Sequence, residues 1–162
     1  AFKNFKELCD RKKEIFDKDI VALVDNKVSQ KDDLIKLLSL EVTCGSIRNP
    51  MVKVILNYKG KEIQKSNSGN GPVDAIFNCI NDLIENHAKL ELFLINAITK
   101  GTDAQAEVSV RLKENDISVS GTSSDTDTMV ASANAYIIAL NKLIMKRKKR
   151  NIDLNLSTKK IN

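Results

Sequence analysis

The segment from residue 104 to residue 143, AQAEVSVRLKENDISVSGTSSDTDTMVASANAYIIALNKL, decides the fold of this chain. Its first part alternates apolar and polar residues with the period of two that a strand with one buried face requires. The alternation occurs in two runs, Val108, Val110 and Leu112 and then Ile117, Val119 and Gly121. Because the polar run Glu114-Asn115-Asp116 between them predicts a turn, the segment predicts a β-hairpin.

A long helix is predicted after this hairpin. Ser124, Asp125, Thr126 and Asp127 can each accept hydrogen bonds from the free amides of a first helical turn, and carboxylates suit its positive end. Beyond them, apolar residues recur every three or four positions, as in a helix that packs on a sheet. The members of this stripe are Val130, Ala133, Ile137, Leu140 and Ile144. The segment therefore predicts a β-β-α unit.

The same order of patterns occurs earlier in the chain. Val52, Val54 and Leu56 recur as Val108, Val110 and Leu112, while Val73, Ile80 and Leu83 recur as Val130, Ile137 and Leu140. Further strands, predicted from Leu40, from Ile63 and over Leu90 to Ile98, complete each half. The predicted fold is therefore α+β, with two pseudo-symmetric β-β-β-α units. Because one such unit leaves a sheet face uncovered, we expect the two halves, and two chains, to combine their layers.

The net charge of +5 equals the charge of one basic run, Lys146-Arg147-Lys148-Lys149-Arg150, so the rest of the chain is neutral. Such a run can bind nucleic acid, but it is more often a solvated helix end that the helix dipole favours. Only 4% of residues are aromatic, so platforms for stacking single-stranded bases are scarce. We expect no nucleic-acid partner, and we expect deletion of residues 146–162 to change stability by roughly 1 kcal/mol or less.

Cys9, Cys44 and Cys79 form no Cys-x-x-Cys pair, which predicts reduced thiols in a cytoplasmic protein. We find no apolar run of membrane-spanning length and no signal-peptide core, and therefore expect no membrane association. The single histidine, His87, lies at a polar helix end and cannot supply a His-x-His metal pair or a nucleophile system. We therefore assign no catalytic residue, no metal site and no cofactor.

Two loops that each connect a strand to a helix form the candidate site. These are the segments 69–75 and 121–130, where helix N-termini offer unpaired amides and glycines allow close approach of a small anion. The carboxylate of an amino acid could accept hydrogen bonds from such amides. Asp74 and Asp127 are placed to form an ion pair with its ammonium group. Val73, Leu90, Phe93 and Ala97 would line a pocket for a branched aliphatic tail. The spacing by itself favours the alternative that the aspartates are only caps and the glycines only turns.

The amino-acid sequence of these segments resembles that of the C-terminal regulatory domain of 2-isopropylmalate synthase. The resemblance rests on Gly69-Asn70-Gly71-Pro72-Val73-Asp74-Ala75, Gly101-Thr102-Asp103-Ala104-Gln105, Asp125-Thr126-Asp127, Ala131-Ser132-Ala133 and the run from Ala135 to Asn141. It spans about Leu40 to Leu143. It implies a pseudo-twofold, intertwined homodimer that binds L-leucine for feedback inhibition.

The resemblance also implies which residues bind leucine. They are Gly71, Val73, Ala75, Leu90, Phe93, Ala97, Ser124, Asp125, Thr126 and Asp127, and the loop chemistry described above adds Gly69 and Asp74 to the predicted leucine site. Many relatives carry Tyr at the position of Phe93, so a hydroxyl contact would be missing here. The implied parent enzyme transfers an acetyl group from acetyl-CoA to 2-oxoisovalerate in a separate catalytic domain that holds a divalent metal. This chain would be a partner of that domain and inactive alone.

A rival within the same fold is the isoleucine-sensing domain of citramalate synthase. Its relatives usually open the second helix with an Asn-Ile-Ile-Glu-Ala-Ser type sequence. This chain has Asp127-Thr128-Met129-Val130-Ala131-Ser132, which favours the leucine pathway. A rival of another class is a nucleic-acid-binding module that uses Lys146 to Arg150.

Three segments are expected along the chain. Apolar stripes around Phe5 and Leu23 predict two small helices in residues 1–33, which resemble the helical linker subdomain of these synthases. A helical hairpin packed on its own domain is equally compatible. Residues 34–148 would form the regulatory domain. Residues 149–162 are expected to be a loose C-terminal tail, although Ile152, Leu154 and Leu156 alternate as an edge strand would.

Overall fold

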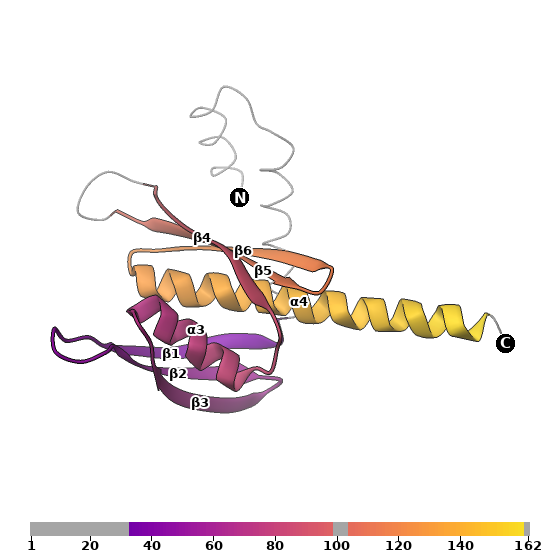
Figure 1. Ribbon diagram of the computed structural model, residues 1–162, viewed down its shortest axis with the longest axis horizontal. Helices are drawn as coiled ribbons and strands as arrows, with labels where there is room; N and C mark the ends of the chain where they lie inside the picture. Colours follow the sequence, from indigo (N-terminus) through magenta and orange to yellow (C-terminus); the bar gives the residue numbers. More distant parts are fainter. Residues whose placement is uncertain (1–32, 99–103, 161–162) are drawn as a thin grey trace, which may run out of the picture. The chain divides into compact units, whose positions relative to one another are not determined.

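Figure 1 shows the computed structural model of the chain, which describes residues 33–98 and 104–160. The chain divides between Asp33 and Leu34 into two units. The two helices predicted within residues 1–33 lie outside the described residues. The second unit, which carries the candidate site, is described below.

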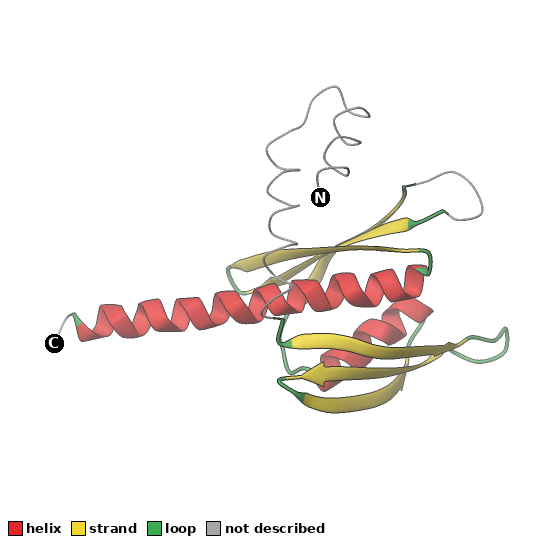
Figure 2. Cartoon of the chain, turned by 180° about the vertical axis from the view of Figure 1, so that it is seen from behind, coloured by secondary structure: helices red, strands yellow, loops and turns green. Residues whose placement is uncertain are grey.

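The second unit consists of two halves with the same order of elements (Figure 2). The first half contains β1 (Ile35–Thr43), β2 (Met51–Tyr58), β3 (Lys61–Ser68) and α3 (Pro72–Leu83). The second half contains β4 (Lys89–Ala97), β5 (Ala106–Glu114), β6 (Ile117–Asp125) and α4 (Thr128–Lys159). Each half forms an antiparallel three-stranded sheet, in the order β1-β2-β3 and β4-β5-β6. The predicted pair of β-β-β-α units is confirmed.

The core is built from the central strand of each sheet and the helix that covers it. The repeated triplets of the sequence, Val52-Val54-Leu56 on β2 and Val108-Val110-Leu112 on β5, are all fully buried. Helix α3 packs on β2 and β3, whereas α4 packs on β5 and β6 and also contacts α3 and β1. The helices therefore lie between the two sheets (Figure 1).

A buried amide joins the two halves. The Asn141 side chain of α4 accepts a hydrogen bond from the backbone N–H of Ile35 and donates one to the Ile35 carbonyl, each at 3.0 Å. Since an unpaired polar group at this depth would be costly, both amide atoms of Asn141 find partners on β1. The contact fixes the first strand of one half against the helix of the other.

Gly121 permits the close packing of α4 on β6. A Cβ atom at this position would lie 2.1 Å from the carbonyl oxygen of Ala135 and 2.7 Å from the amide nitrogen of Ala139. These are backbone atoms of α4, so the clash could be relieved only by moving the helix away from the sheet. The glycine that ends the second predicted run of alternation therefore has a packing function.

Two strand boundaries differ from the sequence-based expectations. Strand β1 begins at Ile35 rather than near Leu40, because a bulge between Leu37 and Ser39 interrupts the period of two. Strand β6 continues through residues predicted to form a loop, as far as Asp125, because its ladder with β5 extends to the pair Ala106 and Asp125. Ser124 and Asp125 therefore belong to a strand end.

The largest correction concerns the C-terminal segment. Helix α4 continues to Lys159, so the prediction of a loose tail or an edge strand over residues 149–162 is wrong for the part of that segment that the structure describes. The basic run lies in the middle of the helix and not at its end, so the helix dipole does not explain it. Every residue from 151 to 160 is exposed, and in Figure 1 the yellow end of α4 extends past the sheets of this unit.

Helix α4 also changes one expectation about apolar runs. Among the described helices, only α4 is long and apolar enough to cross a membrane, contrary to the expectation that no such run exists. However, 56% of its apolar window is buried inside the unit. This burial is that of a core helix that packs on a sheet.

Candidate functional site

The start of α3 is an uncapped helix N-terminus. Gly71 is the N-cap residue and Pro72 is the first helical residue, and no side chain caps this turn. The first helical hydrogen bond runs from the Ala75 amide to the Gly71 carbonyl at 3.0 Å. The amides of Val73 and Asp74 precede it and so have no acceptor within the helix. A Cβ atom on Gly71 would meet no atom within 4 Å, so the space at Gly71 itself, where the helix begins, is open.

The loop before α3 is held in shape by its own residues. The Asp74 carboxylate accepts a hydrogen bond from the Asn70 amide at 3.0 Å. Gly69 packs under this contact, where a Cβ atom would lie 2.5 Å from the Ala75 nitrogen and 2.8 Å from Asp74 Oδ2. Gly69 is therefore required by the loop itself, and Asp74 braces the loop while remaining exposed. Binding of a ligand ammonium group by Asp74 stays a prediction.

The start of α4 differs because an aspartate side chain caps its first turn. Asp127 Oδ1 accepts a hydrogen bond from the Met129 amide at 2.8 Å, and Asp125 Oδ1 accepts one from the Asp127 amide at 2.8 Å. The Thr126 hydroxyl also reaches Asp125 Oδ1, at 3.5 Å. Asp127 is thus an N-cap, as the alternative reading of the loop predicted. Of the two loops, the one at α3 has no side-chain cap on its first turn.

Strand β4 presents a half-open apolar strip whose far end, at Ala97, lies toward these helix starts. Leu90, Phe93 and Ala97 pair with Leu112, Val110 and Ala106 of β5, so they share the core face of the sheet. Helix α4 covers β5 and β6, which leaves this face of the edge strand β4 partly open. Leu90 is 47% exposed, Phe93 is half-buried and Ala97 is exposed. Such a strip suits the tail of an aliphatic ligand.

One member of this strip was missed by the sequence reasoning. Ile95 pairs with the buried Val108, so it lies on the same face between Phe93 and Ala97, and it is 47% exposed. Strict alternation from Phe93 would have found it. The bulge between Leu90 and Leu92 explains why Leu90, three positions before Phe93, shares that face.

The structure brings the predicted loops and the later part of the strip, from Phe93 to Ala97, to one end of the unit, whereas Leu90 pairs with Leu112 near the other end of β4. The Phe93 ring lies 5.8 Å from the Phe77 ring of α3, and Val73 is one helical turn before Phe77. Ala97 pairs with Ala106, which pairs with Asp125, so the end of β4 lies two strand spacings, about 10 Å, from the segment that caps α4. Figure 1 shows the starts of α3 and α4 on this same side of the unit.

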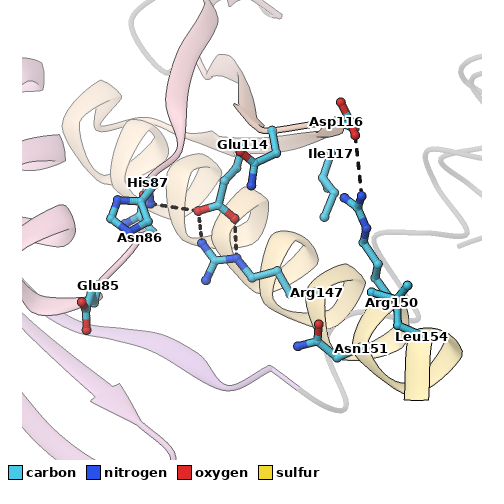
Figure 3. A pocket seen from close by; sticks show the side chains of 11 residues that line it. Glu85, Asn86, His87, Glu114, Asp116, Ile117, Arg147, Arg150, Asn151 and Leu154 are labelled. Atoms are coloured by element: carbon cyan, nitrogen blue, oxygen red, sulfur yellow. Dashed lines mark hydrogen bonds and ion pairs between the residues drawn. The ribbon is translucent and has the colours of Figure 1, made fainter. Parts of the chain in front are cut away.

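A groove of about 780 Å³ lies at the opposite end, beside the turn between β5 and β6 (Figure 3). Its floor is Glu114, which pairs with Arg147 of α4 through two hydrogen bonds and accepts one from the His87 amide at 2.9 Å. The hydrogen bonds from Arg147 hold the pKa of Glu114 below its usual value, against the opposing effect of burial. His87 contributes its backbone here, and its side chain is exposed.

The chemistry of this groove indicates a structural role. Four of its charged side chains form two ion pairs, since Arg147 pairs with Glu114 and Arg150 faces Asp116 at 3.6 Å. Over residues 33–98 and 104–160, no group of three or more His, Cys, Asp or Glu side chains could hold a metal ion. We therefore derive no metal-dependent step from the described residues. Sequence reasoning missed the groove because Glu114 and Arg147 are 33 residues apart and looked like a turn residue and part of a solvated charge run.

Comparison with known proteins identifies the domain. Residues 14–144 match the family model of the LeuA allosteric (dimerisation) domain. The chain is 52% identical to a 2-isopropylmalate synthase of Rhodopseudomonas palustris (strain BisB18) and 51% identical to one of Bradyrhizobium sp. (strain ORS 278), over 149 residues in each case. The matches cover 92% of this chain but only 29% and 28% of those relatives. The chain, with its two β-β-β-α units, belongs to the LeuA allosteric (dimerisation) domain family.

Proposed function

We propose that this domain binds L-leucine and thereby mediates feedback inhibition of a 2-isopropylmalate synthase. The observation that carries the proposal is the uncapped start of α3 beside the half-open apolar strip of β4. An aliphatic amino acid has a carboxylate that can bind at the start of α3 and a side chain that can pack on the strip of β4. The family description and the identity to 2-isopropylmalate synthases support leucine as the amino acid.

The leucine carboxylate would accept hydrogen bonds from the amides of Val73 and Asp74, which the partial positive charge of the helix N-terminus strengthens. Gly71 leaves room for this approach. The exposed carboxylate of Asp74 stands beside these amides and would attract the ammonium group. In this arrangement the polar half of the ligand is held by α3.

The leucine side chain would pack between Val73 and the strip on β4. Burying such a side chain is worth about 2 to 3 kcal/mol. The strip is extended by Ile95, which supplies apolar surface next to Phe93. Because Phe93 lacks the hydroxyl of a tyrosine, this wall of the site is wholly apolar, and selectivity must come from shape.

Within the parent enzyme, the domain would act on a catalytic domain that lies in the remaining length of relatives of this kind. That domain would transfer the acetyl group from acetyl-CoA to 2-oxoisovalerate and would hold the divalent metal. The part of the chain that the structure describes would act through binding and association, with no catalytic residue of its own.

Homodimer formation is the second part of the proposed role. Leu38 on β1, Met51 on β2 and Leu94 on β4 are large apolar residues that are each about half exposed. Covering them with a second chain would bury apolar surface that a monomer leaves in water. Sedimentation equilibrium at micromolar concentration is expected to give twice the 18.0 kDa chain mass. A mass of one chain would contradict this part of the proposal.

Isothermal titration calorimetry at physiological salt tests the ligand. We expect leucine to bind with the lowest dissociation constant, isoleucine more weakly, and a short single-stranded RNA not at all. Tighter binding of isoleucine would favour a citramalate synthase regulatory domain instead. Binding of RNA alone would replace the effector role with nucleic-acid binding, although Arg147 and Arg150 of the basic run already face Glu114 and Asp116.

A further inference from the structure

Three aromatic rings connect strand β4 with both helices. The Phe93 ring meets Phe77 of α3 edge to face, with a centroid distance of 5.8 Å and an interplanar angle of 75°. Phe77 in turn stacks on Tyr136 of α4, at 4.3 Å and 25°. The Tyr136 hydroxyl donates a hydrogen bond to Asn81 Oδ1 on α3 at 2.6 Å. The rings therefore form a continuous row from the apolar strip to the interior.

Phe77 lies at the inner side of the proposed ligand site. It is one helical turn after Val73, so the two side chains share a face of α3. Phe77 is only 7% exposed, whereas Leu90 and Ile95 of the strip are each 47% exposed. An aliphatic group that enters between Val73 and the strip would meet the Phe77 ring as its depth increases.

The Phe77 ring is held so that it cannot easily yield. One of its faces stacks on Tyr136, which is 2% exposed and whose hydroxyl donates a hydrogen bond to Asn81. Packed interiors resist displacement because neighbouring side chains leave few voids. A ring supported in this way sets a firm limit on the length of the group in front of it.

We propose that Phe77 is the floor of the effector site and determines the size of the aliphatic side chain that the site accepts. This inference rests on the proposed function, since it concerns the same ligand. The amides at the start of α3 would bind the carboxylate of the ligand. Phe77, one turn further along the helix, would contact the end of the ligand's side chain and limit its length. Leucine would fill this interval, and a larger side chain would collide with the ring.

The test compares the wild type with Phe77→Leu by calorimetric titration with leucine and phenylalanine. Replacing the ring by a shorter side chain deepens the site. The ratio of the phenylalanine to the leucine dissociation constant is expected to fall by about tenfold or more, the change that one or two methylene-sized groups make in an apolar pocket. Ile76→Val, at the neighbouring fully buried position on α3, removes core volume but leaves all three rings in place, and should leave the ratio unchanged.

Each outcome decides the proposal. An unchanged ratio in a folded Phe77→Leu protein overturns it, even if both proteins bind leucine. An equal change in Ile76→Val would show a general loosening of the core and would also overturn it. If Phe77→Leu does not fold, Phe77→Met provides the same comparison with a better-filled core. If the wild type binds neither amino acid, the proposed function fails first, and the role of Phe77 falls with it.

Discussion

The carboxylate of Glu114, at the end of β5, accepts hydrogen bonds from both Nε and Nη2 of Arg147 in the middle of α4. The same carboxylate accepts a hydrogen bond from the backbone N–H of His87, a residue in the segment that leads into β4. One side chain, 6% exposed, thus links a strand, the long helix and the entry to the neighbouring strand (Figure 3). Because Glu114 is buried, its charge depends on Arg147 for compensation.

Replacing Arg147 by methionine is expected to lower the free energy of unfolding by about 2 to 3 kcal/mol, because it leaves a buried carboxylate without its cation. The matched control is Arg150→Met. Arg150 and its partner Asp116 are exposed, so this change should cost less than about 1 kcal/mol. Urea denaturation measures both values. Equal losses in the two variants would show that the Glu114 pair is no stronger than a surface pair.

The ion pair also changes the expected effect of shortening the chain. Removal of residues 146–162 would delete Arg147 and should destabilise the domain by about as much as Arg147→Met. Removal of residues 152–162 alone deletes a segment that is exposed helix as far as Lys159, and should shift the melting temperature by only a few degrees. Thermal denaturation of the two shortened chains separates these cases. A large loss from the shorter deletion would mean that the exposed part of α4 is docked.

Acidification should weaken the domain through Glu114. Hydrogen bonds from Arg147 lower the pKa of Glu114 from its ordinary 4.5, so the folded state favours the ionised form. A lowered pKa contributes stability that is fully present above about pH 4.5 and is lost as the pH falls through the folded-state pKa. Urea midpoints measured from pH 7 to pH 3 should therefore fall more steeply for the wild type than for Glu114→Gln. Parallel curves would remove Glu114 from the acid response.

Gly121→Ala is expected to destabilise the domain by about 3 kcal/mol, because the new methyl group would overlap the α4 backbone at Ala135. Gly45→Ala is the control, since a Cβ atom there meets no atom within 4 Å and its φ is not positive. That change should stay within about 0.5 kcal/mol. Chemical denaturation of both variants decides the matter, and equal stabilities would mean that α4 can move away from β6 at little cost.

The repeated halves could be predicted because their signals are local. Val52-Val54-Leu56 and Val108-Val110-Leu112 alternate without interruption, and each strand that they predicted is present as the centre of a sheet. Where a bulge breaks the alternation, as in β1, the strand start was missed. The bulge in β4 likewise separates Leu90 from the Phe93-Ile95-Ala97 series.

Long-range contacts were beyond local patterns. The length of α4 beyond Ile144 could not be inferred, because Arg147 looked like part of a solvated charge run until Glu114 was placed opposite it. The row of Phe93, Phe77 and Tyr136 joins three elements and has no signature in the spacing of these residues. Capping by Asp127, in contrast, is a local interaction, and the sequence offered it as one reading of the loop.

The central claim is that the start of α3 receives the carboxylate of leucine, and Gly71→Val tests it with little risk to the fold. The new side chain would point into open space, and the φ of −149° at Gly71 is one that valine adopts readily. It would, however, block approach to the amides of Val73 and Asp74. Lys148→Ala, in the exposed part of the basic run, is the matched control.

The deciding measurement is thermal denaturation of the wild type, Gly71→Val and Lys148→Ala with leucine, isoleucine or alanine. Leucine at 100 times its dissociation constant should stabilise the wild type and Lys148→Ala by about 2.7 kcal/mol and leave Gly71→Val unchanged. Alanine, which lacks the aliphatic tail, should have little effect on any of the three. If leucine stabilises the wild type no more than alanine does, this domain is not a leucine sensor.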